Sequence, residues 1–72
     1  MIVTNKQGDR FSVFRSMDQH KRTVLVMGKL SPVEPVVRLA IASGSNPDLW
    51  HIMDSAAVSL DDVLKYYELT KV

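Results

Sequence analysis

Hydrophobic and polar residues alternate along the first thirty residues in the way that is typical of β-strands. A short β-branched run begins at residues 2–3, and Phe11 and Val13 share one face of a second run. The run 23–27 is rich in β-branched residues and ends at Gly28, which makes it the clearest strand prediction. Polar connections separate these runs at 5–9 and 16–21. The pattern predicts an antiparallel hairpin or a small three-stranded sheet.

After Ser31 the apolar spacing changes to that of helices, and three short helices are predicted. The first follows a capping box formed by Ser31 and Glu34 and ends near Gly44. The second covers 46–58, where apolar residues recur at the i, i+3, i+4 and i+7 positions after an Asn-Pro start. The third covers about 59–69, with Ser59 as its cap and Leu60, Val63, Leu64 and Tyr67 as its apolar stripe.

These elements predict a single α+β domain over residues 1–72, with an N-terminal hairpin or three-stranded sheet packed against about three short C-terminal helices. The alternative is a small SH3-like β-barrel. In that alternative 49–53 and 66–72 are strands, and only 59–63 forms a helical turn. The β-branched pair Val36-Val37 also leaves a strand open within the first predicted helix.

Length and composition limit the class of protein. A chain of 72 residues without cysteine has no disulfide or thiolate metal site to stabilise it. Such a chain buries only about 60% of its unfolded surface, so either a well-packed core or an oligomer or partner must complete it. Apolar runs stay well below the roughly 18 residues of a membrane span, and the first ten residues lack a signal-peptide core. We therefore expect a cytoplasmic protein with no membrane partner.

The charge of +1 conceals an uneven distribution. Residues 1–30 carry six cationic and two acidic side chains, whereas 31–72 carry three cationic and six acidic ones. A basic ribbon could contact an anion such as a phosphate backbone, or its cations could simply protect the sheet edges from aggregation. The candidate residues for anion or nucleic-acid contact are Lys6, Arg10, Arg15, Lys21, Arg22 and Lys29.

The titratable residues predict neither catalysis nor metal binding. His20 and His51 lie 31 positions apart and share no metal-ligand spacing. Asp61 and Asp62 are adjacent on the third predicted helix, so their carboxylates point about 100° apart and do not converge. We therefore expect no catalytic residues, no metal and no cofactor.

Two aromatic residues are candidates for contact with a partner. Tyr67 belongs to the apolar stripe of the last predicted helix, so the adjacent Tyr66 is the more exposed of the two. Trp50 lies off the main stripe of its own predicted helix, and Trp and Tyr are enriched where proteins bind one another. We therefore predict a small non-enzymatic module that binds another protein or a second copy of itself, through Trp50 and Tyr66. The alternative is a nucleic-acid-binding module that uses the basic ribbon.

Overall fold

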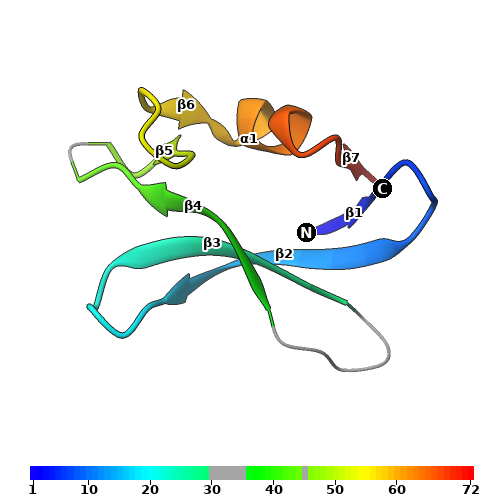
Figure 1. Cartoon of the computed structure of the whole chain (residues 1–72), viewed down its shortest axis with the longest axis horizontal. Coiled ribbons are helices and arrows are strands. Elements are labelled where there is room, and N and C mark those ends of the chain that lie inside the picture. The colour runs from blue at the N-terminus through cyan, green and yellow to red at the C-terminus, as the bar shows by residue number, and fades with distance from the viewer. Residues whose placement is uncertain (30–35, 45) are drawn as a thin grey trace.

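The computed structural model describes residues 1–29, 36–44 and 46–72, which form one curled antiparallel sheet and one short helix (Figure 1). The strands are β1 (Ile2–Thr4), β2 (Arg10–Met17), β3 (Thr23–Lys29), β4 (Val37–Ala42), β5 (Leu49–His51), β6 (Val58–Ser59) and β7 (Thr70–Lys71), and the helix is α1 (Leu60–Tyr66). Their order in the sheet is β6-β5-β4-β3-β2-β1-β7.

The three N-terminal strands that the alternation predicts are present. β1 pairs with β2 and β2 pairs with β3, each antiparallel. The side-chain oxygen of Asn5 holds the first turn by accepting hydrogen bonds from the backbone of Gln7 and Asp9. Gly8 supplies the positive φ of 83° that this turn requires. Val13 is buried and Phe14 is exposed, as the alternation indicates.

The prediction of three helices packed on a small sheet is wrong. Residues 37–42 form β4, and the predicted second helix is replaced by β5, a turn and β6. In this second segment Trp50 and Ile52 are buried at a spacing of two, whereas Met53, which the helical stripe placed inside, is 81% exposed. Residues 49–51 form a strand rather than a helix because they pair with β4, and burial in a sheet outweighs a weak local helical preference. The capping box at Ser31 and Glu34 lies outside the described residues.

The last predicted helix is confirmed, although it is shorter than predicted. Ser59 is its N-cap and accepts a hydrogen bond from the backbone N–H of Asp62. Asp61 and Asp62 occupy the first turn, where carboxylates stabilise the positive end of the helix dipole. The helix ends at Tyr66 rather than near residue 69 because Glu68 turns into the left-handed region, with a φ of 58°, and β7 follows.

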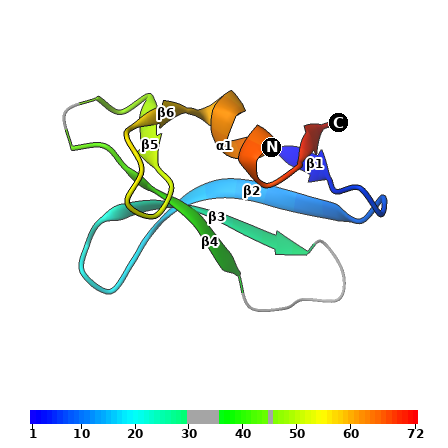
Figure 2. The ribbon, with the colours of Figure 1, turned by 45° about the horizontal axis from the view of Figure 1, so that its top comes forward.

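The helix completes the architecture by joining the two edges of the sheet. β6 and β7 are the outermost strands at opposite edges, and α1 runs from one to the other above the curled strands (Figures 1 and 2). The SH3-like alternative expects strands at 49–53 and 66–72, where the structure has the shorter β5 and β7. The described strands form an open curled sheet, with a helix between its edges in place of a closed barrel.

The core fills the space between the curled sheet and the helix. Its buried members are Val3, Val13, Leu25, Leu39, Ala40, Trp50, Ile52, Val63, Leu64 and Leu69. A shift of register between Leu25 and Val26 places a bulge in β4, so that the consecutive residues Leu39 and Ala40 are both buried. The bulge increases the local twist that curls the sheet around α1.

Candidate functional site

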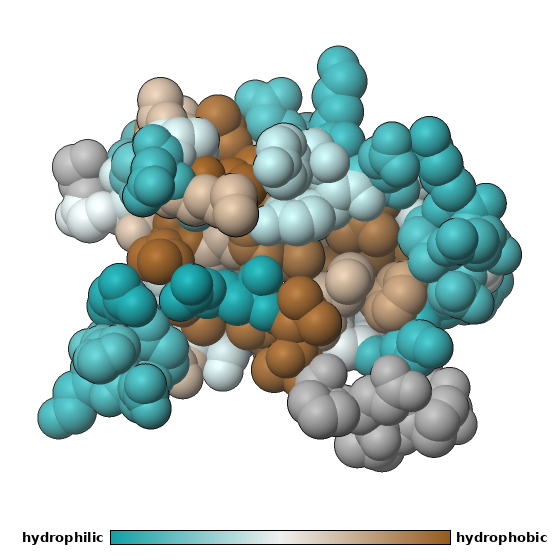
Figure 3. All heavy atoms as spheres, viewed as in Figure 1, coloured by the Kyte–Doolittle hydropathy of each residue, from teal (hydrophilic) through white to brown (hydrophobic). Residues whose placement is uncertain are grey.

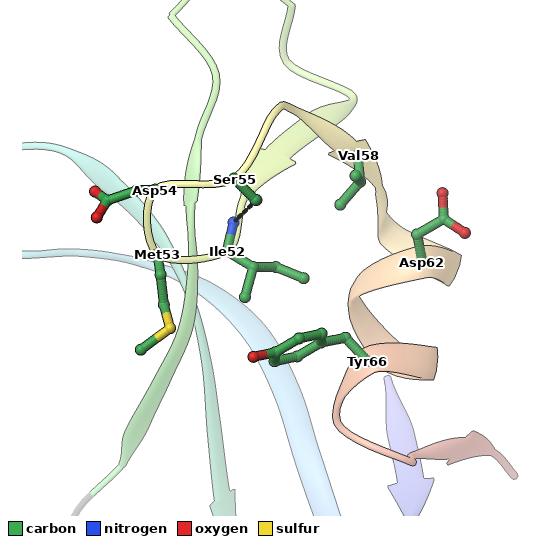
Figure 4. Close-up of a pocket in the computed structure, with 7 residues that line it drawn as sticks. All are labelled: Ile52, Met53, Asp54, Ser55, Val58, Asp62 and Tyr66. Carbon is green, nitrogen blue, oxygen red and sulfur yellow. Dashed lines mark hydrogen bonds between the residues drawn. The ribbon is translucent and has the colours of Figure 1, made fainter.

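A groove of about 520 Å³ lies between α1 and the turn that follows β5 (Figure 4). Its lining residues are Ile52, Met53, Asp54, Ser55, Val58, Asp62 and Tyr66. The side chains of Ile52 and Val58 supply an apolar floor. Met53 on the turn and Tyr66 on the helix stand on opposite sides, so the groove has an exposed apolar side chain on each wall (Figure 4).

Ser55 fixes the shape of the turn. Its hydroxyl accepts a hydrogen bond from the backbone N–H of Ile52 at 3.1 Å and donates one to the carbonyl of Ala56 at 3.0 Å. Its backbone N–H donates to the carbonyl of Ile52, and its own carbonyl lies 2.9 Å from Nδ1 of His51. This last contact requires the histidine tautomer with a proton on Nδ1. The turn is therefore well anchored to β5.

Met53 combines two features that are unfavourable in an isolated molecule. Its φ of 53° lies in the left-handed region, which costs an L-residue roughly 1–2 kcal/mol relative to the usual conformation. Its apolar side chain is also 81% exposed. A glycine or an asparagine would adopt this turn at a lower cost. The turn therefore holds an exposed apolar side chain at the rim of the groove in a conformation that is unfavourable for an L-residue.

Tyr66 is held in place from behind by its neighbour. Val63 and Leu64 anchor the buried side of α1, which leaves Tyr66 60% exposed on the other side. The ring of Tyr67 packs edge-on against that of Tyr66, with a centroid distance of 5.0 Å and an interplanar angle of 82°. The Tyr67 hydroxyl donates a 2.6 Å hydrogen bond to the carbonyl of Leu39 on β4. Tyr66 is thus an exposed aromatic residue in contact with an anchored ring, and tyrosine, with two χ angles, loses little entropy on binding.

Burial raises the pKa of Tyr67 above its ordinary value of 10.0, and the nearby Tyr66 raises it further. Arg38 acts weakly in the opposite direction. The phenol is consequently neutral at physiological pH, so it can keep donating its proton to the Leu39 carbonyl.

Two aspartates stand at the rim of the groove, and their carboxylates are directed outward, away from its floor (Figure 4). Asp54 lies on the turn and Asp62 on the helix, and neither side chain forms an ion pair within the described part of the chain. The adjacent Asp61 differs, because its carboxylate lies 2.9 Å from the ammonium of Lys71. An apolar floor between two unpaired carboxylates suits an apolar side chain that is flanked by a cation.

The two predicted contact residues are separated by the fold. Tyr66 is exposed on the groove, whereas Trp50 is only 2% exposed and belongs to the core. Arg15 covers the Trp50 ring, with its guanidinium carbon 5.3 Å from the ring centroid. The guanidinium also donates a hydrogen bond to the carbonyl of Pro47. Trp50 is therefore not available to a partner in this structure. The available signal for this burial was the spacing of two between Trp50 and Ile52 with the polar His51 between them, although the flanking Leu49 and Met53 are apolar.

The six basic candidates do not form one continuous surface. Lys6 pairs with Glu68 at 3.1 Å, and Arg22 pairs with Asp18 at 2.9 Å. Arg15 is held against Trp50, as described above. Lys21 and Arg22 lie in the turn between β2 and β3. Arg10 and Lys29 lie together at the other end of this strand pair, away from the turn. The antiparallel pairing therefore divides the basic ribbon between two ends of the molecule.

The side chain of Asp18 stabilises the turn that joins β2 to β3. Its carboxylate accepts hydrogen bonds from the backbone of Arg22 and His20 and from the Arg22 guanidinium. The backbone hydrogen bond from Arg22 is the main reason that the pKa of Asp18 lies below its ordinary value of 3.8. This network explains the local structure of the turn and leaves Arg22 less available to an external anion.

The described part of the chain shows neither a metal-binding cluster nor a membrane-spanning helix. Within residues 1–29, 36–44 and 46–72, no three side chains of the metal-binding types come together to hold an ion. The same ranges contain no helix with the length and apolar character to cross a membrane. Comparison of the chain with protein-family models, with curated proteins and with solved structures finds no match.

Sequence reasoning missed the groove because the turn was predicted to be part of a helix. In a helix, Ile52 and Met53 would both lie on the buried stripe. The tight turn instead sends Ile52 to the floor and Met53 to the rim. The Asp54-Ser55 pair, a common turn sequence, was the available signal.

Proposed function

We propose that this protein is a small non-enzymatic binding module that holds a segment of another protein in the groove between α1 and the 52–55 turn. The observation that carries the proposal is the exposed pair Met53 and Tyr66 on either side of an apolar floor. The favoured partner segment presents one apolar side chain with a lysine or arginine beside it. The apolar side chain enters the groove, and the cation meets Asp54 or Asp62.

The chemistry of the groove supports binding rather than catalysis. The hydroxyl of Ser55 already accepts one hydrogen bond and donates another within the turn. His51 is held by the Ser55 carbonyl and is not hydrogen-bonded to a hydroxyl nucleophile in the described residues. A nucleophile needs a positioned base to activate it, and this groove supplies no such pair.

A random peptide library displayed on phage tests this function. Selection against the protein should enrich peptides that combine an apolar residue with a neighbouring Lys or Arg. Replacing Tyr66 by alanine should weaken the binding of the selected peptides by about 2 kcal/mol, which is roughly thirtyfold in affinity. A loss of this size is typical of a central interface residue. The binding should also weaken as salt screens the two carboxylates.

Met17 provides the matched control. It is 65% exposed and lies at the end of β2, so Met17→Ala removes an exposed apolar side chain outside the groove. The control should bind the selected peptides as the unmodified protein does. If the Tyr66→Ala protein enriches the same peptides with equal affinity, the groove is not the binding site.

A further inference from the structure

The second half of β2 forms an exposed edge of the sheet. On the β1 side the last contact is made by Met1, whose backbone amine donates to the carbonyl of Val13 and whose carbonyl accepts from its N–H. In the described part of the chain, residues 14–17 pair with β3 alone, and Figure 2 shows β1 beside the far end of β2. All four residues are exposed, and the large apolar side chains of Phe14 and Met17 are 42% and 65% exposed.

The backbone groups that point out of this edge belong to Arg15 and Met17. Successive residues of an antiparallel strand direct their N–H and C=O groups to opposite neighbours. Val13 bonds to Met1 on the β1 side, so Arg15 and Met17 point to that side as well, and the residues between them bond to β3. The guanidinium of Arg15 lies over Trp50, on a face of the sheet, and does not cover the edge.

The end of β2 stands clear of the body of the molecule. After Met17 the chain turns toward β3, because the backbone N–H of Asp18 bonds to the carbonyl of Arg22 and closes the turn. Figures 1 and 3 show this turn at the lower left, where it projects as a hydrophilic arm. An unpaired strand edge of this kind presents donors and acceptors that can pair with another strand.

We propose that two copies of this chain associate through this edge, with residues 15–17 of one β2 paired antiparallel to residues 15–17 of the other. The two-fold axis passes between the two Ser16 residues, so each Arg15 lies opposite the Met17 of the other copy. Each of these pairs exchanges two backbone hydrogen bonds, which adds about four across the interface. The association goes beyond the proposed function, because no residue of this edge lines the groove.

The register follows from the groups that are available. A two-fold axis at Arg15 would place the two cationic side chains directly opposite each other, which is unfavourable. It would also pair Met17 with Val13, whose N–H and carbonyl are already bonded to Met1. An axis at Met17 would place Arg15 opposite the turn, where no strand continues. The register centred on residue 16 uses both free positions and brings no like charges into direct opposition.

Ser16 suits its place at the centre of this interface. Its backbone bonds to β3, so the two Ser16 residues form a non-hydrogen-bonded pair, in which the Cα atoms approach to about 4.5 Å. A small side chain fits this close approach, and paired hydroxyl side chains can hydrogen-bond across strands. Met17 of each copy lies beside the aliphatic part of the opposite Arg15, so an exposed apolar side chain is partly covered.

A second copy suits this short edge better than a flexible segment of another protein. The edge offers few hydrogen bonds, and a disordered segment loses conformational entropy when it becomes a strand. The β2 of a second copy is already held in the extended form by β3. A chain of 72 residues without cysteine also gains stability from surface buried in an oligomer. The interface is small, so we expect a weak, reversible dimer.

Sedimentation equilibrium of the protein alone tests the dimer. The unmodified protein should dimerise with a dissociation constant below about 1 mM. Ser16→Lys places two like charges where the strands approach most closely and should weaken dimerisation at least about tenfold. Ser12→Lys adds the same charge on the same face of β2, but where β1 already pairs with the strand. This control should dimerise within about twofold of the unmodified protein.

Amide hydrogen exchange in the unmodified protein decides the question even if Ser16→Lys does not fold. The N–H groups of Arg15 and Met17 should exchange more slowly as the protein concentration rises to about 1 mM, whereas those of Phe14 and Ser16, already bonded to β3, should not change.

Three results would each overturn the dimer. They are a protein that stays monomeric at about 1 mM, exchange at Arg15 and Met17 that does not depend on concentration, and a folded Ser16→Lys protein that dimerises as tightly as the unmodified one. Because no peptide is present in these experiments, their failure leaves the groove untouched, and failure of the peptide selection leaves the dimer untouched.

Discussion

Tyr66 and Trp50 show how little the identity of an aromatic residue says about its role. Both were predicted to contact a partner, yet one is 60% exposed and the other 2%. The difference follows from the elements that carry them. Tyr66 lies on the outer side of a helix whose other side is anchored by Val63 and Leu64, whereas Trp50 lies on the inner face of a strand beneath Arg15.

Alanine substitution should separate these two roles. We expect Trp50→Ala to reduce the free energy of unfolding by about 3–5 kcal/mol, because it leaves a large cavity in the core. Tyr66→Ala should reduce it by only about 1 kcal/mol, because Tyr66 is mostly exposed and loses little beyond its edge-on contact with Tyr67. Urea denaturation followed by circular dichroism measures both. A Tyr66→Ala protein that loses as much stability as the Trp50→Ala protein would show that Tyr66 is a structural residue.

Tyr67→Phe tests the hydrogen bond that supports Tyr66. Loss of the hydroxyl leaves the Leu39 carbonyl without this donor and should cost about 1 kcal/mol. The raised pKa of Tyr67 also predicts a dependence on pH. Its contribution to stability is complete below the unfolded-state pKa of 10.0 and is lost as the pH rises through the higher folded-state value. The stability difference between the two proteins should therefore shrink in alkali, and a constant difference would contradict this.

Among the elements, α1 was predictable because its signals are local. A serine cap, two acidic residues in the first turn and an apolar stripe lie within nine residues of one another, between Ser59 and Tyr67. β4 and β5 were not predictable in the same way. Their stability comes from pairing with the strands that precede and follow them, and the residues 49–56 carry a local helical spacing that this pairing overrides.

The end of α1 has a structure that the sequence conceals. The backbone N–H groups of Glu68 and Leu69 donate to the carbonyls of Lys65 and Leu64, which is a Schellman motif. Such motifs usually have glycine at the left-handed position, and here the residue is Glu68. The missing glycine removed the signal that would have marked the end of the helix.

Glu68→Gly should consequently stabilise the protein. Relief of the left-handed strain exceeds the added entropy of the unfolded glycine, and we expect a gain of roughly 0.5–1 kcal/mol in unfolding free energy. The substitution also removes the exposed ion pair with Lys6, which is worth little. Lys6→Ala removes that pair without changing the turn and serves as the control. A loss of stability in Glu68→Gly measured by urea denaturation would contradict the strain argument.

At the scale of the whole molecule, the fold distributes the cations of residues 1–30 over separate places. The antiparallel β2 and β3 carry their cations to opposite ends, and Lys6, Arg15 and Arg22 are engaged by other residues. The sequence could predict which residues are basic but not how they are distributed in space, because that depends on the register of the strands.

We therefore expect weak affinity for nucleic acid. Phosphate recognition depends on several cations acting together, and the affinity falls steeply with salt. Fluorescence anisotropy with a labelled single-stranded oligonucleotide should detect no binding at about 50 mM salt. Tight, salt-sensitive binding that Lys21→Ala and Arg10→Ala each abolish would instead restore the basic ribbon as the functional surface.

The most direct test of the account is to locate the selected peptide on the folded protein by NMR. Addition of the peptide to ¹⁵N-labelled protein should produce the largest amide shift changes in the 52–55 turn and in residues 62–66 of α1, with only minor changes in the turn between β2 and β3. Shift changes confined to β2 and that distant turn would contradict the central claim that the groove between Met53 and Tyr66 is where this protein binds its partner.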